Sequence, residues 1–194
     1  PILNDSSLGR CMASDSTFPG FHSPAAGPEH PLDMLSACHE RVQRQCDTLL
    51  RLWTYLQSHV VDPTAADAAM AILNYFEKSA PHHHADEEQD LLPALERKLM
   101  AQERTALQSL SQELMRQHRV LESRWSTLQA SLRAIANQQP VTLVQEEVDT
   151  FVSGYRAHID LEEGQLLPWA KRVLDETDLQ TLGLSMSQRR GLRL

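Results

Sequence analysis

The sequence predicts an all-α protein, an antiparallel up-down-up-down four-helix bundle with an irregular N-terminal arm and a short C-terminal helix. Long segments that are poor in glycine place apolar side chains at alternating steps of three and four residues, the period of an amphipathic helix. Short breaks such as "VDPTAAD" separate these segments, and no segment shows the alternation that is typical of a half-buried strand. Short connections between long helices favour antiparallel neighbours.

The chain divides into three parts by composition. Residues 1–30 are rich in serine, proline and glycine and lack an apolar period, so we expect an irregular arm in which Met12 would make a natural start. Residues 31–174 carry the helical pattern and should form the bundle, because a chain of 194 residues suits a single core. Residues 175–194 should form a short helix and tail, with Thr177 as a candidate N-cap.

Four helices account for the central part of the chain. Pro81 should kink the second helix near its middle, because proline lacks the amide donor of a helical hydrogen bond. The third helix has a nearly unbroken heptad stripe of apolar residues. The expected ranges are about 31–59, 64–98, 101–137 and 141–174.

Charge and composition exclude several classes of function. Acidic residues outnumber basic ones by 26 to 18, so the formal charge is −8 and no basic stripe suggests nucleic-acid binding. The sequence shows neither a membrane-spanning apolar run nor a signal peptide, so we expect a cytoplasmic protein with no membrane partner. Cys38 and Cys46 would lie about 12 Å apart along one helix, too far for a disulfide, and are expected to be buried and reduced.

Each of the four helices places one histidine on its apolar stripe. A single histidine in such a position is more often a core residue with a hydrogen-bond partner than a metal ligand. Four of them on four helices would bring several imidazoles together in one core, which is unfavourable unless a partner satisfies them. A metal is such a partner. The four histidines are His39, His83, His118 and His158.

Two carboxylates strengthen the metal hypothesis. Glu87 follows His83 by four residues, and Glu162 follows His158 by four, so each pair shares a helix face. The two segments also repeat, because "HHADEEQDLLP" at 83–93 aligns with "HIDLEEGQLLP" at 158–168 without gaps. The repeat selects His83, rather than a neighbouring histidine, as the equivalent of His158.

Imidazole and carboxylate together favour iron, with manganese or zinc as alternatives. The order of histidine and glutamate differs from the Glu-xx-His of ferritin-like bundles, which disfavours that chemistry. For His84 three roles stay open: metal ligand, support of a ligand, or contact with another helix. Asp86 is expected at the surface. The residues expected to be solvated because they fall off the stripe are His82, Glu88, Asp90 and Glu163.

Residues 31–173 resemble the hemerythrin-like HHE cation-binding family in the order of these histidines and acids, and in the wording around "HHxxEExxLLP". The resemblance implies a non-heme site with two irons per chain, bridged by carboxylates. Where oxygen-carrying members have a second histidine on the third helix, this chain has Glu122, which would favour ferric iron and argue against reversible oxygen carriage. The candidate ligands are His39, His83, His84, Glu87, His118, Glu122, His158 and Glu162.

The resemblance favours a protein that binds or senses dioxygen, nitric oxide, peroxide or iron. One alternative is a di-iron enzyme that reduces peroxide or nitric oxide, which would need a separate redox partner protein because the chain has no flavin or nucleotide motif. A second alternative is a helical interaction module that works without metal. A homodimer is compatible with all three hypotheses.

Overall fold

The computed structural model describes residues 27–191, and within this range the chain is helical and has no strand. The predicted all-α class is therefore confirmed. The expected arm up to residue 26 and the last three residues lie outside the described range. The helices are α1 (Pro31–Leu56), α2 (Pro63–Ala85), the π-helix η1 (Asp86–Leu91), α3 (Leu92–Lys98), α4 (Ala101–Ala136), α5 (Gln145–Leu161), the π-helix η2 (Glu162–Leu166), α6 (Leu167–Val173) and α7 (Glu176–Arg189).

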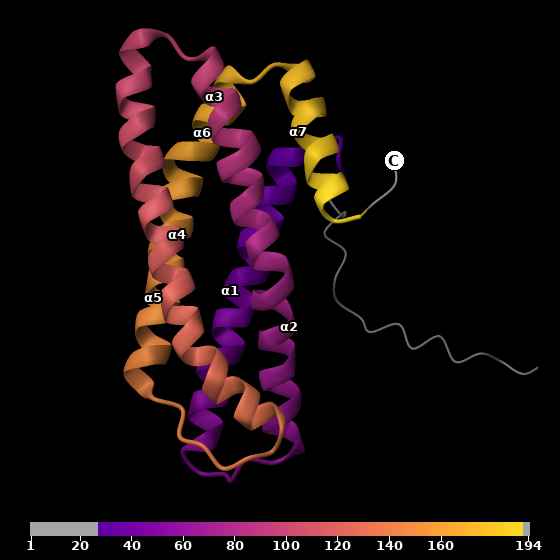
Figure 1. Ribbon diagram of the computed structural model, residues 1–194, viewed down its shortest axis with the longest axis vertical. Helices are drawn as coiled ribbons and strands as arrows, with labels where there is room; N and C mark the ends of the chain where they lie inside the picture. The colour runs from indigo at the N-terminus through magenta and orange to yellow at the C-terminus, as the bar shows by residue number, and fades with distance from the viewer. Residues whose placement is uncertain (1–26, 192–194) are drawn as a thin grey trace, which may run out of the picture.

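The long helices α1, α2, α4 and α5 lie side by side as a bundle (Figure 1). Helix α1 packs against α2 and α5, and α4 packs against the same two helices from the other side. The α1–α2 and α4–α5 connections lie at one end of the bundle, and α3 leads into α4 at the other end (Figure 1). The bundle is thus made of two helix pairs, α1 with α2 and α4 with α5, whose connecting loops lie at the same end.

Capping residues explain where two of the helices begin. Asp62 precedes Pro63, and its side chain accepts a 2.9 Å hydrogen bond from the Ala65 amide at the start of α2. Asp175 caps α7 in a reciprocal capping box with Asp178. The predicted cap of this last helix was wrong, since the cap is Asp175 and Thr177 lies inside α7.

The two repeated segments each contain a π-helix. Helix α2 continues through Pro81, and the departure from α-helical geometry comes later, at Asp86. Both π-helices are followed at the second position by a proline, Pro93 or Pro168. Because proline lacks an amide hydrogen and its ring crowds the preceding turn, a widened turn just before it relieves the conflict. The gapless sequence repeat is thus matched by a repeat of backbone geometry.

The core consists of two apolar clusters separated by a polar layer. Helix α1 shows the pattern: Leu35 belongs to the first cluster and Val42 to the second, with buried His39 between them. Helix α4 shows it as well, since His118 lies between Leu114 and Leu121. On each of these helices the predicted stripe is buried along its length, and it is apolar except where the histidine lies in the polar layer.

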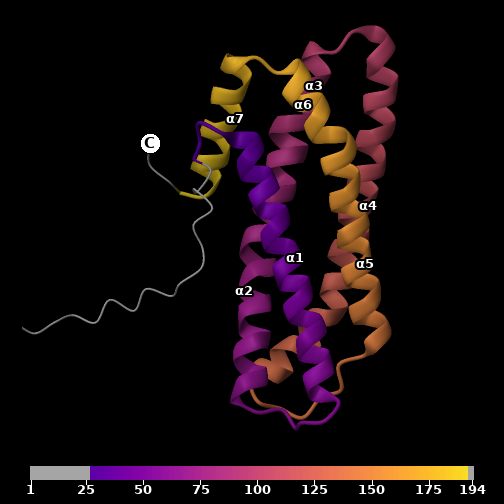
Figure 2. The same cartoon turned by 180° about the vertical axis from the view of Figure 1, so that it is seen from behind.

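Helix α7 lies against the outside of the bundle beside α1, as both views show (Figures 1 and 2). Its Gly183 is needed there, because a Cβ atom at this position would come within 1.9 Å of the Pro28 carbonyl oxygen. The end of α7 brings Arg189 and Arg190 to the carboxylate of Asp86, which is fully buried. The prediction that Asp86 lies at the surface was wrong, because α7 covers it.

Within residues 27–191, none of the helices combines the length and the apolar character needed to cross a lipid bilayer.

Candidate metal centre

The polar layer at the middle of the bundle consists of six buried side chains. None of the six is more than 2% exposed. The histidines are supplied by the four long helices and the carboxylates by the two π-helices. The six residues are His39, His83, Glu87, His118, His158 and Glu162.

The first half of the layer joins α1 and α2. The Nε2 atoms of His39 and His83 lie 3.1 Å apart. Oε1 of Glu87 lies 3.4 Å from the His83 Nε2 atom, and Oε2 of Glu162 lies 3.0 Å from the His39 Nε2 atom. Two nitrogens and two oxygens therefore surround one small volume.

The second half joins α4 and α5 in the same way. The Nε2 atoms of His118 and His158 lie 3.1 Å apart. The other oxygens of the two carboxylates complete the group: Oε2 of Glu87 lies 3.4 Å from His118, and Oε1 of Glu162 lies 3.0 Å from His158. Each glutamate thus turns one oxygen toward each half, which is the arrangement of a bridging carboxylate.

The donor atoms fit two cations. All four oxygens of Glu87 and Glu162 are buried without a well-oriented hydrogen bond, a costly state for carboxylates in a core. Two ligand atoms that bind one ion at about 2.1 Å and at a right angle are about 3 Å apart. The Nε2 pairs match this separation. Imidazole nitrogen with carboxylate oxygen suits iron, manganese or zinc better than calcium or magnesium.

Three of the four histidines are held by a second polar side chain at the opposite ring nitrogen. Nδ1 of His39 lies 2.7 Å from Glu163, and Nδ1 of His118 lies 2.5 Å from Glu88. Such contacts fix the tautomer and ring orientation of a metal ligand and raise its basicity. Sequence reasoning missed this role for Glu88 and Glu163, whose side chains are 34% and 41% exposed but reach inward. Gln117 supports His158 at 3.0 Å, whereas Nδ1 of His83 has no partner.

The cluster shifts the pKa values of its members in opposite directions. Burial lowers the pKa of His39, but contact with Glu162 and the charges of both carboxylates outweigh it and raise the pKa to about 9. Burial also lowers the pKa of His118, but its contacts with Glu162 and Glu87 outweigh burial and raise the pKa to about 10. Burial lowers the pKa of His83 to about 3.

The pKa values of the two buried carboxyl groups are also shifted in opposite directions. Burial and the charge of Glu162 raise the pKa of Glu87 well above its ordinary value. Burial would also raise the pKa of Glu162, but its contacts with imidazoles, His118 first, hold it well below the ordinary value. Without a cation, one proton is thus held near Glu87 and the negative charge is held on Glu162.

Glu122 does not join this cluster. It is exposed on α4, and the preceding Leu121 is buried in its place. Glu122 has the same spacing from its histidine as Glu87 and Glu162, but the buried stripe of α4 continues from His118 through Leu121 and leaves Glu122 on the solvent side. The prediction of Glu122 as a ligand is therefore corrected, and the argument that it opposes reversible oxygen carriage no longer holds.

His84 does lie beside the cluster. It is 7% exposed, and one of its ring nitrogens lies within 4.8 Å of a ring nitrogen of His118 and of His158. Its ring stacks on that of His118, with centroids 3.9 Å apart and planes 15° apart. Burial lowers the pKa of His84 well below the ordinary value, and its Nε2 atom has no hydrogen-bond partner.

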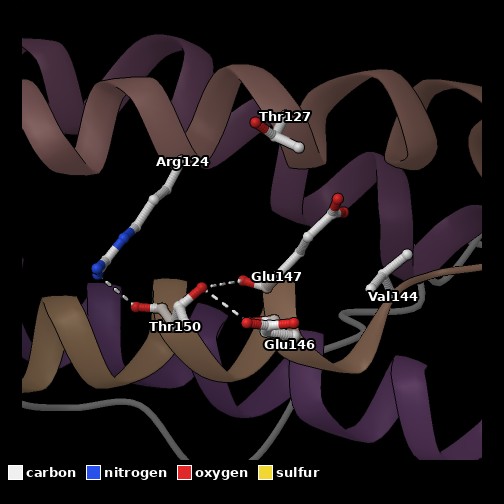
Figure 3. A pocket seen from close by; sticks show the side chains of 6 residues that line it. All are labelled: Arg124, Thr127, Val144, Glu146, Glu147 and Thr150. Atoms are coloured by element: carbon white, nitrogen blue, oxygen red, sulfur yellow. Dashed lines mark hydrogen bonds between the residues drawn. The ribbon is translucent and has the colours of Figure 1, made fainter.

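A surface groove of about 310 Å³ between α4 and the start of α5 lies apart from this cluster (Figure 3). Arg124 crosses it and donates a 2.6 Å hydrogen bond to the Thr150 carbonyl oxygen. None of the candidate ligands lines this groove. The groove and the buried layer of histidines and glutamates are therefore separate features of the molecule.

The fold and the site together define a helical protein with a buried cluster of histidines and glutamates suited to cations. Comparison with known proteins agrees: the hemerythrin HHE cation-binding domain family matches residues 30–170. The chain belongs to this family. It is also 34% identical over 163 residues to a protein of Haemophilus influenzae described as uncharacterized, an alignment that covers 84% of this chain and 91% of the relative.

Proposed function

We propose that this chain is a non-heme di-iron protein that binds or senses a small ligand, namely dioxygen, nitric oxide, peroxide or iron itself. The observation that carries the proposal is the pair of fully buried glutamates, each with one oxygen toward His39 and His83 and the other toward His118 and His158. The proposal includes the antiparallel up-down-up-down order of the four long helices.

The residues divide the work of such a site. His39 and His83 would hold one iron and His118 and His158 the other, with Glu87 and Glu162 shared between them. The irons, when bound, would supply redox electrons and coordination positions for a small ligand. Glu88 and Glu163 hold His118 and His39 in orientation from the solvent side. The buried layer excludes bulk water and any large substrate, because its members are almost inaccessible.

The donor set favours iron over the alternatives. Within residues 27–191 neither cysteine belongs to any of the three groups of candidate donors, so the thiolates that structural zinc commonly uses are missing from the site. Two bridging carboxylates can neutralise part of the charge of two divalent or trivalent ions. The same donors accept manganese, which makes metal identity a quantity to be measured.

The test is metal analysis of the protein after anaerobic reconstitution with ferrous iron. We expect close to two irons per chain, and an optical spectrum that changes when the reduced protein meets air. Glu87→Ala and Glu162→Ala should each lose both irons, because each removes a bridge. Glu122→Ala is a matched control on α4 and should keep both irons. A wild-type protein without iron, or a Glu122→Ala variant that loses as much iron as the bridge variants, would contradict the proposal.

A further inference from the structure

His84 is a buried imidazole for which the di-iron proposal leaves no role. Its side chain packs between cluster residues and the aromatic core, with Tyr155 stacked at 6.4 Å and His158 edge-on at 5.9 Å between ring centroids. The Nε2 atom has no hydrogen-bond partner, and the residue is buried, with only 7% of its surface exposed. A neutral imidazole in a core normally uses both its donor and its acceptor. Something other than a protein group is therefore expected at this nitrogen.

The stacked arrangement separates His84 from the ligands of the second half-site. An imidazole binds a cation in the plane of its own ring. The rings of His84 and His118 lie face to face at 3.9 Å, with planes only 15° apart, so that an ion in the plane of His118 lies outside the plane of His84. His84 is thus placed beside such an ion, where it can contact a further group that the ion holds.

The internal repeat shows that a buried histidine directly after the cluster histidine occurs in the first repeat and not in the second. The residue that corresponds to His84 in the second repeat is Ile159, which is also buried. The residue that corresponds to Tyr155 in the first repeat is Ala80. A polar, hydrogen-bonding wall thus stands beside His118 and His158, whereas the repeat supplies only alkyl side chains at the equivalent places. The two cation positions should therefore differ in what else they accept.

We propose that the external ligand binds on the His118 and His158 side of the centre, and that Nε2 of His84 hydrogen-bonds to it. The ligand class is a small anion or diatomic molecule with a terminal atom that accepts a hydrogen bond. His84 acts as a positioning residue that sets affinity, not as a ligand of the cation. This inference rests on the proposed di-iron function and adds to it the position of the external ligand.

Azide is the probe, because it is a small anion with a terminal acceptor and its binding to ferric iron changes the absorption spectrum. Wild type, His84→Leu, His84→Gln and the control His82→Leu are loaded with iron, analysed for metal and titrated with azide after oxidation. We expect two irons in all four. The azide dissociation constant should rise about tenfold in His84→Leu, the loss of one hydrogen bond. His84→Gln, which keeps a donor, should retain part of the affinity, and His82→Leu should match wild type.

The outcomes separate the two proposals. Wild type without iron would overturn the di-iron function itself, before any azide is added. Normal iron content with unchanged azide affinity in both His84 variants would overturn only the inference. Loss of iron in His84→Leu and His84→Gln alone would show that His84 is a cation ligand, and would overturn it as well. Thermal melting of each variant identifies misfolding, and His84→Gln keeps the test decisive if His84→Leu fails to fold.

Discussion

Loading the centre with metal should displace protons, and the number follows from the residues that hold them. In the metal-free protein the pKa of His39 is about 9 and that of His118 about 10, so both carry a proton at pH 7. The raised pKa of Glu87 adds a third candidate. His83, with a pKa of about 3, and Glu162, with a lowered pKa, hold none. Metal ligands must be deprotonated, so two ions should release about two to three protons.

The sign of the pH dependence follows from the same groups. Because protons compete with metal, the apparent affinity for the ion pair should rise by roughly a hundredfold or more per pH unit between pH 7 and 8, where both histidines stay protonated without metal. Anaerobic calorimetry with ferrous iron, in buffers of different ionisation enthalpy at one pH, counts the protons. Glu122→Gln is the control, because Glu122 is exposed and lies outside the cluster, and it should release as many protons as wild type. Two bound irons with no proton release, or an affinity that is flat across this range, would refute the reasoning.

Three further predictions concern the ligands, the metal-free state and α7. His83→Ala and His158→Ala should lose iron while His82→Ala keeps it, and equal loss in all three by metal analysis would show that the helical register is misassigned. His118 has a folded-state pKa of about 10 against an ordinary value of 6.5. Its contribution to the stability of the metal-free protein should therefore be complete below about pH 6.5 and disappear as the pH rises toward 10. Melting curves across this range test the expectation, and a melting temperature that rises with pH would contradict it. Asp86→Ala should lower the free energy of unfolding by about 2–3 kcal/mol and the melting temperature by roughly 5–10 °C, because two partly buried arginines lose their partner; chemical denaturation measures it, and a change within error would show that α7 docks without this carboxylate.

The helical period predicted which histidines are buried together, because these four occupy positions that apolar residues take elsewhere on the same stripes. His39 lies between Leu35 and Val42 on its stripe and His118 between Leu114 and Leu121, and each is the single histidine of its helix. The repeat then separated His83 from its two neighbours. Periodicity thus locates the residues that replace an apolar side chain in a continuous stripe.

Periodicity failed where the backbone leaves the α-helix. On a regular helix the residue after an inward ligand points about 100° away, so Glu88 and Glu163 were expected in solvent. The π-helices widen the turn at these residues, and both carboxylates reach histidines of another helix. Pro93 and Pro168 were the available signal, since each follows its π-helix closely. Asp86 was misplaced for a different reason: its partners follow about a hundred residues later, and no local pattern encodes the docking of α7.

The contacts between the repeats show that neither half of the bundle contains a complete site. Glu88 belongs to the first repeat and holds His118 on α4, while Glu163 belongs to the second and holds His39 on α1. Glu87 and Glu162 likewise face histidines of both halves. The donors converge only when the two helix pairs pack against each other, so cation binding and closure of the polar layer should be coupled. Since that layer separates two apolar clusters and holds carboxylate oxygens without hydrogen bonds, it is the level at which a cation, when bound, would contribute most to holding the bundle together.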